Sequence, residues 1–348
     1  MDKSTPFRSH SPSPAPVRVA ARPLRRLAMA GALAAAATTG MPQALAQETA
    51  FPQRAVRMVI PFAAGGAIDI MARPIGRRLQ EFLGQPVVID NRAGGGGSLA
   101  AELVARSAPD GYTLLMGSTS PLAINPAALA KVGYDTLRDF TPISLVATQP
   151  LLIVAHPSLP VRNIKDVIAL AKRNPGKLSY GSAGPGTSNH LTGALLAHAA
   201  GIELLHVPYK GGGPALNALL GGETELQVSQ PNTMVAFVKS GRVRAIAITG
   251  AKRSPIYPDV GTLVEAGYKE LDIIGWYCVV GPAHIPKPVV DRLNADLRRT
   301  MAAPDVRNAL LGEGTDPVAS SPEELGALIK RELVRWAAAV KLAGVRPE

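Results

Sequence analysis

The sequence predicts an α/β protein with two lobes. It has 348 residues, of which 47% are hydrophobic and 18% charged, so the chain can bury a large core. Short apolar runs alternate with glycine-rich turns and with segments of helical period, a pattern typical of parallel sheets covered by helices. Because this alternation occurs in two separate stretches, we expect two lobes.

The first stretch lies near the beginning of the chain. Apolar residues with helical spacing from Ile68 to Leu79 predict a helix that Gly84 ends. Apolar runs on either side predict strands, and the turns between them are rich in glycine. The expected strands are 57–62, 87–90 and 113–117, and the expected helices are 68–83 and 99–107.

The second stretch repeats the rhythm, and a helical segment follows it. The sequence Asn174-Pro175-Gly176 ends one amphipathic helix of this stretch. The expected strands are 151–155, 178–181, 204–207 and 244–249, and the expected helices are 164–173, 189–200 and 215–220. Three further helices are expected at 289–302, 304–313 and 322–342.

These elements divide the mature chain into two lobes, each expected to be a mostly parallel sheet flanked by helices. The first lobe is assigned residues 47–147 and 251–348, and the second lobe residues 148–250. An inserted lobe needs two chain crossings, and two crossings form a hinge with a cleft. Ligands of such sheets lie beyond the carboxyl ends of the strands. We therefore expect a ligand cleft at the hinge.

Residues 1–46 have the pattern of a cleavable signal peptide. A basic segment precedes an apolar run at 27–37, and Ala44-Leu45-Ala46 is a small-x-small cleavage site. The apolar run is shorter than the roughly 20 residues of a membrane span, which disfavours the alternative of an anchor helix. We therefore expect a periplasmic protein cleaved near Ala46, and Arg25-Arg26 leaves the choice between Sec and Tat export open.

Charge and aromatic content argue against a nucleic-acid partner. Residues 47–348 hold 31 basic and 25 acidic side chains, a net charge of +6 that is spread along the chain. Aromatic residues make up only 4%, too few for stacking on single strands. A diffuse positive field suits a small anion. We expect a monomer without nucleic-acid contacts.

Cysteine and histidine give no sign of a metal site or a cofactor. Cys278 is the one cysteine, which excludes an internal disulfide and a multi-cysteine metal site. It lies in an apolar run at 276–280, as a buried inert thiol does. The histidines are scattered, and His190 and His198 are eight positions apart, too far for a ligand pair on one helix.

Three glycine-rich loops carry the functional signal. The loops 61–67, 182–188 and 209–214 each follow an expected strand and open an expected helix. Glycine lets the backbone approach a ligand, and free N–H groups at a helix start bind anions. Ordinary turn chemistry would explain one such loop. Three loops that meet at one cleft indicate carboxylate binding.

Enzyme and nucleotide motifs are missing, so no catalytic residue is assigned. Gly176-Lys177 is followed by Leu178, which breaks the phosphate-loop pattern. Ser182 lacks the glycine two positions earlier that a nucleophile elbow needs. Asp69 has two open roles: it complements a helix N-terminus, or it orients a ligand.

Several motifs together resemble a known family. They span nearly all of the chain after the signal peptide and occur in the family's order. In chain order they are Phe62-Ala63-Ala64-Gly65-Gly66 with Asp69 and Arg73, Asp90–Gly96, Asp110–Leu115, Ser182–Gly184, Gly186–Leu191, Val207–Gly211, Arg253–Pro255, Pro258–Val260, Glu265–Gly267 and Gly275-Trp276. The chain thus resembles the Bug-type extracytoplasmic solute receptors of the tripartite tricarboxylate transporter family.

This resemblance implies a two-lobed, type II-like periplasmic-binding-protein fold. It also implies a non-enzymatic receptor that closes on a small carboxylate and delivers it to a membrane permease. No cofactor or metal is implied. The ligand-binding residues that it implies are Phe62, Ala64, Gly65, Gly66, Asp69, Thr119, Ser120, Ser182, Ala183, Gly184, Thr187, His190, Pro208, Tyr209 and Gln230. Lys210 is either a wall residue of the cleft or a solvated surface lysine.

Departures from the family pattern prevent transfer of a particular ligand. Asn217 stands where aspartate is usual, Cys278 replaces a small glycine, and Gly261 replaces a proline. Two rival hypotheses stay open. The first is a secreted enzyme that acts on a small acid with Asp69 or His190 as base. The second is a sensor module that presents its closed form to a membrane kinase.

Overall fold

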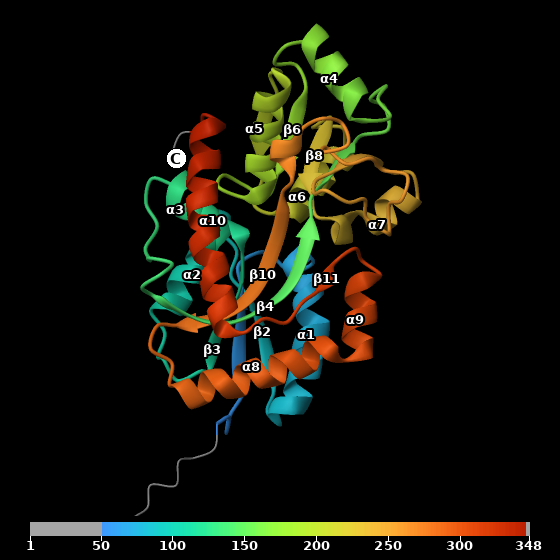
Figure 1. Cartoon of the computed structure of the whole chain (residues 1–348). Coiled ribbons are helices and arrows are strands. Elements are labelled where there is room, and N and C mark those ends of the chain that lie inside the picture. The colour runs from blue at the N-terminus through green and yellow to red at the C-terminus, as the bar shows by residue number, and fades with distance from the viewer. Residues whose placement is uncertain (1–50, 346–348) are drawn as a thin grey trace, which may run out of the picture. The chain divides into compact units, whose positions relative to one another are not determined.

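The computed structural model describes residues 51–345, which form two sheets flanked by helices (Figure 1). The signal peptide predicted for residues 1–46 lies outside the described residues. Within 51–345, no helix is both long and apolar enough to cross a membrane. The predicted α/β class is confirmed, and most predicted helices and strands lie within two or three residues of their expected ends.

The first lobe is built on a six-stranded sheet. Its strand order is β11-β4-β10-β3-β1-β2. The strands are β1 (Val56–Ile60), β2 (Val87–Asn91), β3 (Thr113–Ser118), β4 (Phe140–Pro150), β10 (Ile274–Pro282) and β11 (Asp316–Pro317). Its helical elements are α1 (Ala67–Leu83), η1 (Gly95–Gly97), α2 (Ser98–Ala105), η2 (Ser120–Ile124), α3 (Asn125–Ala128), α8 (Lys287–Ala302), α9 (Pro304–Leu311) and α10 (Pro322–Leu342).

The second lobe is built on a five-stranded sheet with the order β7-β6-β8-β5-β9. The strands are β5 (Leu152–Ala155), β6 (Ser179–Ser182), β7 (Leu205–Pro208), β8 (Leu226–Ser229) and β9 (Arg244–Ile248). Its helical elements are α4 (Ile164–Arg173), α5 (Ser188–Ala200), α6 (Gly212–Leu220), α7 (Pro231–Lys239) and η3 (Lys269–Leu271).

Most strands of each sheet run in one direction, as expected, and β10, β11 and β5 run against the others. β1 pairs in parallel with β2 and β3, and β6 pairs in parallel with β7 and β8. β10 runs antiparallel to β3 and β4, and β5 runs antiparallel to β8 and β9. The reason is topological: the chain leaves the first sheet along β4 and returns along β10, so these neighbours run in opposite directions.

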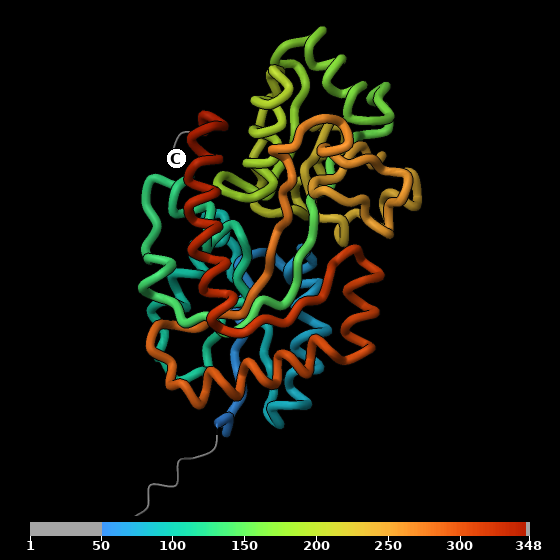
Figure 2. Tube along the Cα trace, in the orientation of Figure 1, coloured from blue at the N-terminus to red at the C-terminus, as the bar shows by residue number. Residues whose placement is uncertain are grey.

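The two sheets are joined by this pair of strands. β10 pairs with β4 from Ile274 opposite Pro150 to Pro282 opposite Phe140, and β5 starts only two residues after Pro150. Figure 2 shows the two chain traces side by side between the lobes. The segment after β9 stays on the second sheet, because Thr262 bridges to Ile248. The lobe boundaries proposed from the sequence stay a prediction.

The first helix shows how the sequence sets an element. The stripe Ile68, Met71, Ala72, Ile75 and Leu79 is buried, as its helical spacing predicts. Gly84 ends the helix with a φ of 71° and donates its N–H to the Gln80 carbonyl. The helix therefore begins and ends where its glycines stand, and its apolar face packs on the sheet.

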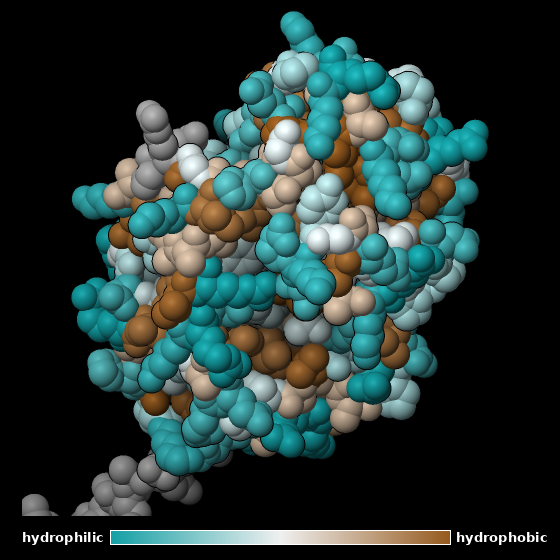
Figure 3. Space-filling model, turned by 45° about the horizontal axis from the view of Figure 1, so that its top comes forward, coloured by the Kyte–Doolittle hydropathy of each residue, from teal (hydrophilic) through white to brown (hydrophobic). Residues whose placement is uncertain are grey.

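Buried apolar side chains run without a break from one lobe to the other. One cluster contains Val59 and Leu122 of the first lobe together with Leu191 and Val228 of the second. By contrast, Figure 3 shows a face covered mostly by hydrophilic side chains. The large apolar side chains that are exposed are Val88, Leu99, Leu137, Leu205, Leu311, Val334 and Leu342.

A buried carboxylate ties the last helix to the crossing strand β10. The Glu332 carboxylate on α10 accepts hydrogen bonds from the indole N–H groups of Trp276, at 3.1 Å, and Trp336, at 2.9 Å. All three residues are at least nine-tenths buried. A buried donor without a partner is costly, so this carboxylate stabilises the packing of α10 on β10.

We expect Glu332→Ala to lower the free energy of unfolding by about 3 kcal/mol, because two buried indole N–H groups lose their acceptor. Glu332→Gln keeps one side-chain oxygen and should lose clearly less. Urea unfolding measures both. Glu323→Ala, an exposed position on the same helix, is the control and should change stability by less than about 0.5 kcal/mol. If Glu332→Ala and Glu323→Ala lowered the free energy of unfolding equally, the stabilising role of the Glu332 carboxylate would be contradicted.

Candidate ligand-binding site

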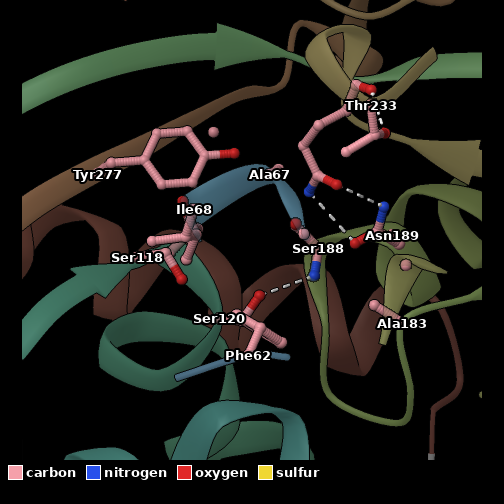
Figure 4. A pocket seen from close by; sticks show the side chains of 15 residues that line it. Phe62, Ala67, Ile68, Ser118, Ser120, Ala183, Ser188, Asn189, Thr233 and Tyr277 are labelled. Atoms are coloured by element: carbon pink, nitrogen blue, oxygen red, sulfur yellow. Dashed lines mark hydrogen bonds between the residues drawn. The ribbon is translucent and has the colours of Figure 1, made fainter. Parts of the chain in front are cut away.

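A pocket lies between the two lobes, and we call it the inter-lobe pocket (Figure 4). Its cavity is about 40 Å³, room for a few water-sized groups. The first lobe contributes the loop after β1, the end of β3 and part of β10, and the second contributes the starts of α5, α6 and α7. Its lining is Phe62, Gly66, Ala67, Ile68, Ser118, Thr119, Ser120, Ala183, Ser188, Asn189, Gly212, Gln230, Thr233, Gly275 and Tyr277.

Four helices start at the wall of this pocket. Gly66 is the N-cap of α1, Ser188 and Gly212 open α5 and α6, and Gln230 is the N-cap of α7. No side chain caps α1, α6 or α7. Helix N-termini carry partial positive charge and free N–H groups. The pocket therefore favours a negatively charged group without needing a basic side chain.

None of the fifteen lining residues is charged, and the remaining polar groups are hydroxyls and amides. Asp69 lies one turn into α1, outside this lining, and is buried. Its carboxylate accepts the Gly65 N–H at 2.9 Å and, through its two oxygens, the Nε–H and Nη2–H of Arg73 at 2.9 and 3.0 Å. These bonds fix the loop that opens α1.

Opposing effects act on the pKa of Asp69. Burial raises it, but hydrogen bonds from Arg73, Gly65 and Asn91 lower it by more, so the net pKa lies below the ordinary 3.8. Asp69 is therefore ionised at neutral pH and is already neutralised by Arg73. The geometry gives it the role of holding the loop, and a role in orienting a ligand stays a prediction.

The structure places the sequence-predicted residues in three groups. Those in the lining of the inter-lobe pocket are Phe62, Gly66, Thr119, Ser120, Ala183 and Gln230. Those that line a neighbouring cavity are Gly184 and Tyr209. Those that line neither cavity are Ala64, Gly65, Asp69, Ser182, Thr187, His190 and Pro208. Ligand contact stays a prediction for all of them.

The neighbouring cavity, of about 360 Å³, shares Phe62 and Ala183 with the inter-lobe pocket. The glycine turn 94–97 forms one of its sides, with φ between 55° and 137° at every position, a conformation that only glycine adopts freely. Lys210 lines this cavity and is exposed. Lys210 therefore has features of both roles left open for it: it lines a cavity wall, and its side chain is exposed to solvent.

Two hydrogen bonds hold the lobes together at the pocket. The Ser188 N–H at the start of α5 donates to the Ser120 hydroxyl at 3.1 Å (Figure 4). The Asn232 side-chain amide on α7 donates to the Ala67 carbonyl at 3.0 Å. Both bonds join the first turn of a second-lobe helix to the first lobe, so they form only when the lobes are close.

The sequence reasoning missed several lining residues. The missed residues are Ala67, Ile68, Ser118, Ser188, Asn189, Gly212, Thr233, Gly275 and Tyr277. Ser118 and Thr233 had a usable signal, because a polar residue at a strand end or in a first helical turn faces the carboxyl edge of the sheet. Tyr277 has no such signal in the sequence, because it lies within the apolar run of β10.

A stacked pair of histidines, with His190 buried and His206 half-buried, lies beneath the loop that follows β6. The rings of His190 and His206 stack at a centroid distance of 3.9 Å, with 8° between their planes. His206 Nε2 is 2.7 Å from the Ser182 hydroxyl oxygen, which also accepts the Gly184 N–H at 3.1 Å. His206 thus fixes the first residue of the Ser-Ala-Gly loop through its side chain.

Both imidazoles are neutral at ordinary pH. Burial lowers the pKa of His190 from 6.5 to about 4. Burial, and then the nearby His190, lowers the pKa of His206 to about 3. A positive charge on either ring would be poorly solvated and would repel a charge on the other. The side chain that holds the Ser-Ala-Gly loop, His206, is therefore uncharged.

Fold and pocket together define a two-lobed solute-binding protein. Residues 71–345 match the family model described as the tripartite tricarboxylate transporter family receptor. A relative from Pseudomonas sp. (strain P51), the "UPF0065 protein in tcbD-tcbE intergenic region", is 42% identical over 313 residues, or 90% of this chain and 92% of the relative.

Two solved structures agree with this chain closely. The "periplasmic binding protein BugD" is 38% identical, with a TM-score of 0.82 over 86% of this chain and 100% of that one. The structure "R. palustris Rpa4515 with adipate" is 34% identical, with a TM-score of 0.83 over the same shares. The chain therefore belongs to the tripartite tricarboxylate transporter receptor family. The Bug-type resemblance and the two-lobed periplasmic-binding-protein fold are confirmed.

The histidine pair predicts how stability depends on pH. In the unfolded chain both imidazoles take up protons near pH 6.5, whereas the folded protein excludes those protons until about pH 4. The free energy of unfolding should therefore fall as pH drops from 6.5 toward 4. His206→Gln removes one of these groups, so its curve should be shallower by up to about 1.4 kcal/mol per pH unit.

Urea unfolding at pH 7, 5.5 and 4.5 measures this slope. Ser182→Ala is the control, because it removes the hydroxyl partner but leaves both imidazoles buried, and it should keep the wild-type slope. Parallel curves for the wild type and His206→Gln would show that His206 does not exclude a proton in the folded state.

Proposed function

We propose that the protein is a periplasmic receptor that captures a small carboxylate and delivers it to the membrane subunits of a tripartite tricarboxylate-type transporter. The observation that carries this proposal is the meeting of four helix N-termini, from both lobes, at a pocket without a charged side chain. Such an arrangement stabilises an anion by backbone groups. The adipate bound in the Rpa4515 structure supports a carboxylate as that anion.

Ligand entry in this proposal depends on the hinge. The cavity of about 40 Å³ is too small for an acid of several carbon atoms, so the lobes must separate to admit one. Bending of the paired strands β4 and β10 allows this motion, and the Ser188–Ser120 and Asn232–Ala67 bonds close over the ligand. Closure would then present the two-lobe surface that a permease recognises.

The location and the export route belong to the same proposal. Relatives that are periplasmic binding proteins support a periplasmic location, and the N-terminal pattern supports signal cleavage near Ala46. We also propose that the receptor acts as a monomer.

One contact favours the enzyme alternative, and the position of Ser182 outside the pocket lining argues against it. Ser182 lies 2.7 Å from His206, as a nucleophile and base would. Ser182 is fully buried and does not line the inter-lobe pocket, so an acid bound there would not reach it. We therefore place the protein among receptors rather than enzymes. Nothing in the described residues favours the sensor alternative.

The proposal predicts that one small carboxylate raises the melting temperature and is recovered unchanged. A ligand at about 100 times its Kd adds about 2.7 kcal/mol, which is a shift of a few degrees for a protein of this size. Native mass spectrometry of protein purified from its host, followed by a thermal-shift panel of small carboxylates, tests this.

Ala183→Leu is designed to fill the pocket and should abolish the shift. Ala251→Leu, on an exposed position away from the pocket, should keep it. A ligand that returns chemically altered would favour the enzyme alternative. A panel in which no carboxylate shifts the midpoint would count against the receptor.

A further inference from the structure

Two buried hydroxyl groups lie side by side on the first-lobe wall of the inter-lobe pocket. Ser118 on β3 and Tyr277 on β10 are directly opposite each other in the antiparallel pair, so their side chains leave the sheet on one face. Both line the pocket, and they are 5% and 4% exposed. Figure 4 shows them together on the same wall.

Neither hydroxyl is well satisfied by the protein. The Ser118 hydroxyl is buried without a hydrogen-bond partner among residues 51–345. The Tyr277 hydroxyl makes a long contact, 3.5 Å, to the Gln149 side-chain oxygen, and the side chain of Gln230 lies close enough to lower its pKa. Buried polar groups in proteins are nearly always hydrogen-bonded, so each exception calls for an explanation, and one that lines a pocket can be completed by a ligand. Of the side chains that line the pocket, Ser118 is the one with a buried unpaired atom in the described chain.

The opposite wall offers a complementary polar group. Gln230 and Asn189 of the second lobe contact each other through their amides at 3.4 and 3.5 Å, which are long and weak bonds. The Asn189 amide also donates to the Val228 carbonyl at 2.7 Å, so Asn189 is held in place. The Gln230 amide can therefore exchange its weak contact for a ligand.

These groups suit a neutral oxygen. Burial raises the pKa of the Tyr277 phenol well above its usual value of 10, so it stays a neutral hydroxyl that donates a hydrogen bond. Ser118 can donate or accept. No cation lines the pocket beside them, whereas the helix N-termini already serve a carboxylate.

Building on the proposed function, we propose that Ser118 and Tyr277 select a carboxylate ligand that also carries a hydroxyl or carbonyl oxygen. The ligand class is thus a small hydroxy- or oxo-acid. Its carboxylate binds the helix N-termini, and its neutral oxygen takes the hydrogen bonds of the two hydroxyls. A plain acid has only hydrogen atoms at the position of this oxygen. When it binds, the hydroxyls of Ser118 and Tyr277 stay buried without a hydrogen-bond partner, which lowers its affinity.

Matched acids that differ by one hydroxyl test this selection. Titration calorimetry of the purified protein is carried out with lactate and propionate, 3-hydroxybutyrate and butyrate, and malate and succinate. In the pair whose carbon skeleton fits, we expect the hydroxy-acid to bind at least about tenfold more tightly, because a hydrogen bond to a buried hydroxyl is then gained.

Variants show whether these two residues cause the preference. Tyr277→Phe and Ser118→Ala should each reduce the ratio of the two Kd values severalfold, and together they should bring it close to one. Each should also bind the plain acid somewhat more tightly than the wild type does, because the hydroxyl that this acid leaves unpaired is gone. The controls are Tyr112→Phe and Ser144→Ala, whose hydroxyls bond elsewhere in the first lobe and should keep the wild-type ratio.

The outcomes separate this inference from the proposed function. Equal binding of hydroxy- and plain acids would overturn the selection by Ser118 and Tyr277 and leave the carboxylate receptor intact. A hydroxyl preference that survives both substitutions would overturn the assignment to these residues. If none of the six acids binds, the receptor proposal for small carboxylates is itself in doubt, and the inference falls with it.

Discussion

Strands β4 and β10 cross between the lobes as one antiparallel pair, and the pocket depends on that pairing. Because the two strands are hydrogen-bonded along their length, they form one continuous connection between the lobes. The pair also supplies a wall of the pocket, since Gly275 and Tyr277 belong to β10. Glu332 braces the same strand from outside through Trp276. The connection between the lobes, the pocket wall and the contact with Glu332 of α10 thus all involve strand β10.

In the inter-lobe pocket, backbone groups rather than charged side chains favour a negatively charged ligand. Helix N-termini replace basic side chains, and the one nearby acid, Asp69, is paired with Arg73 so that it does not repel an anion. Beneath the second-lobe loop, His190 and His206 are held neutral by burial. Such a site has few charged groups to titrate, and specificity is left to neutral hydrogen-bonding groups such as Ser118 and Tyr277.

Much of the fold could be predicted because local patterns decide local elements. The helix from Ala67 to Leu83 follows from its apolar stripe and from Gly84, and the loops rich in glycine were placed before helices as found. β10 was missed for a physical reason: a strand buried on both faces has no alternation of polar and apolar residues. The antiparallel partners of β10 and β5 could not be predicted, because a local pattern does not encode which strands pair.

The sequence by itself determined the α/β class, the family and the kind of site. A glycine-rich turn followed by a helix leaves backbone N–H groups free for an anion, and this pattern is local in the sequence. Only the tertiary structure decided which residues meet. Ser118 and Tyr277 are 159 positions apart and become neighbours through the β3–β10 pairing, and Asn232 reaches Ala67 only when two lobes close. Such contacts come from long-range strand pairing and lobe packing, which no local stretch of sequence specifies.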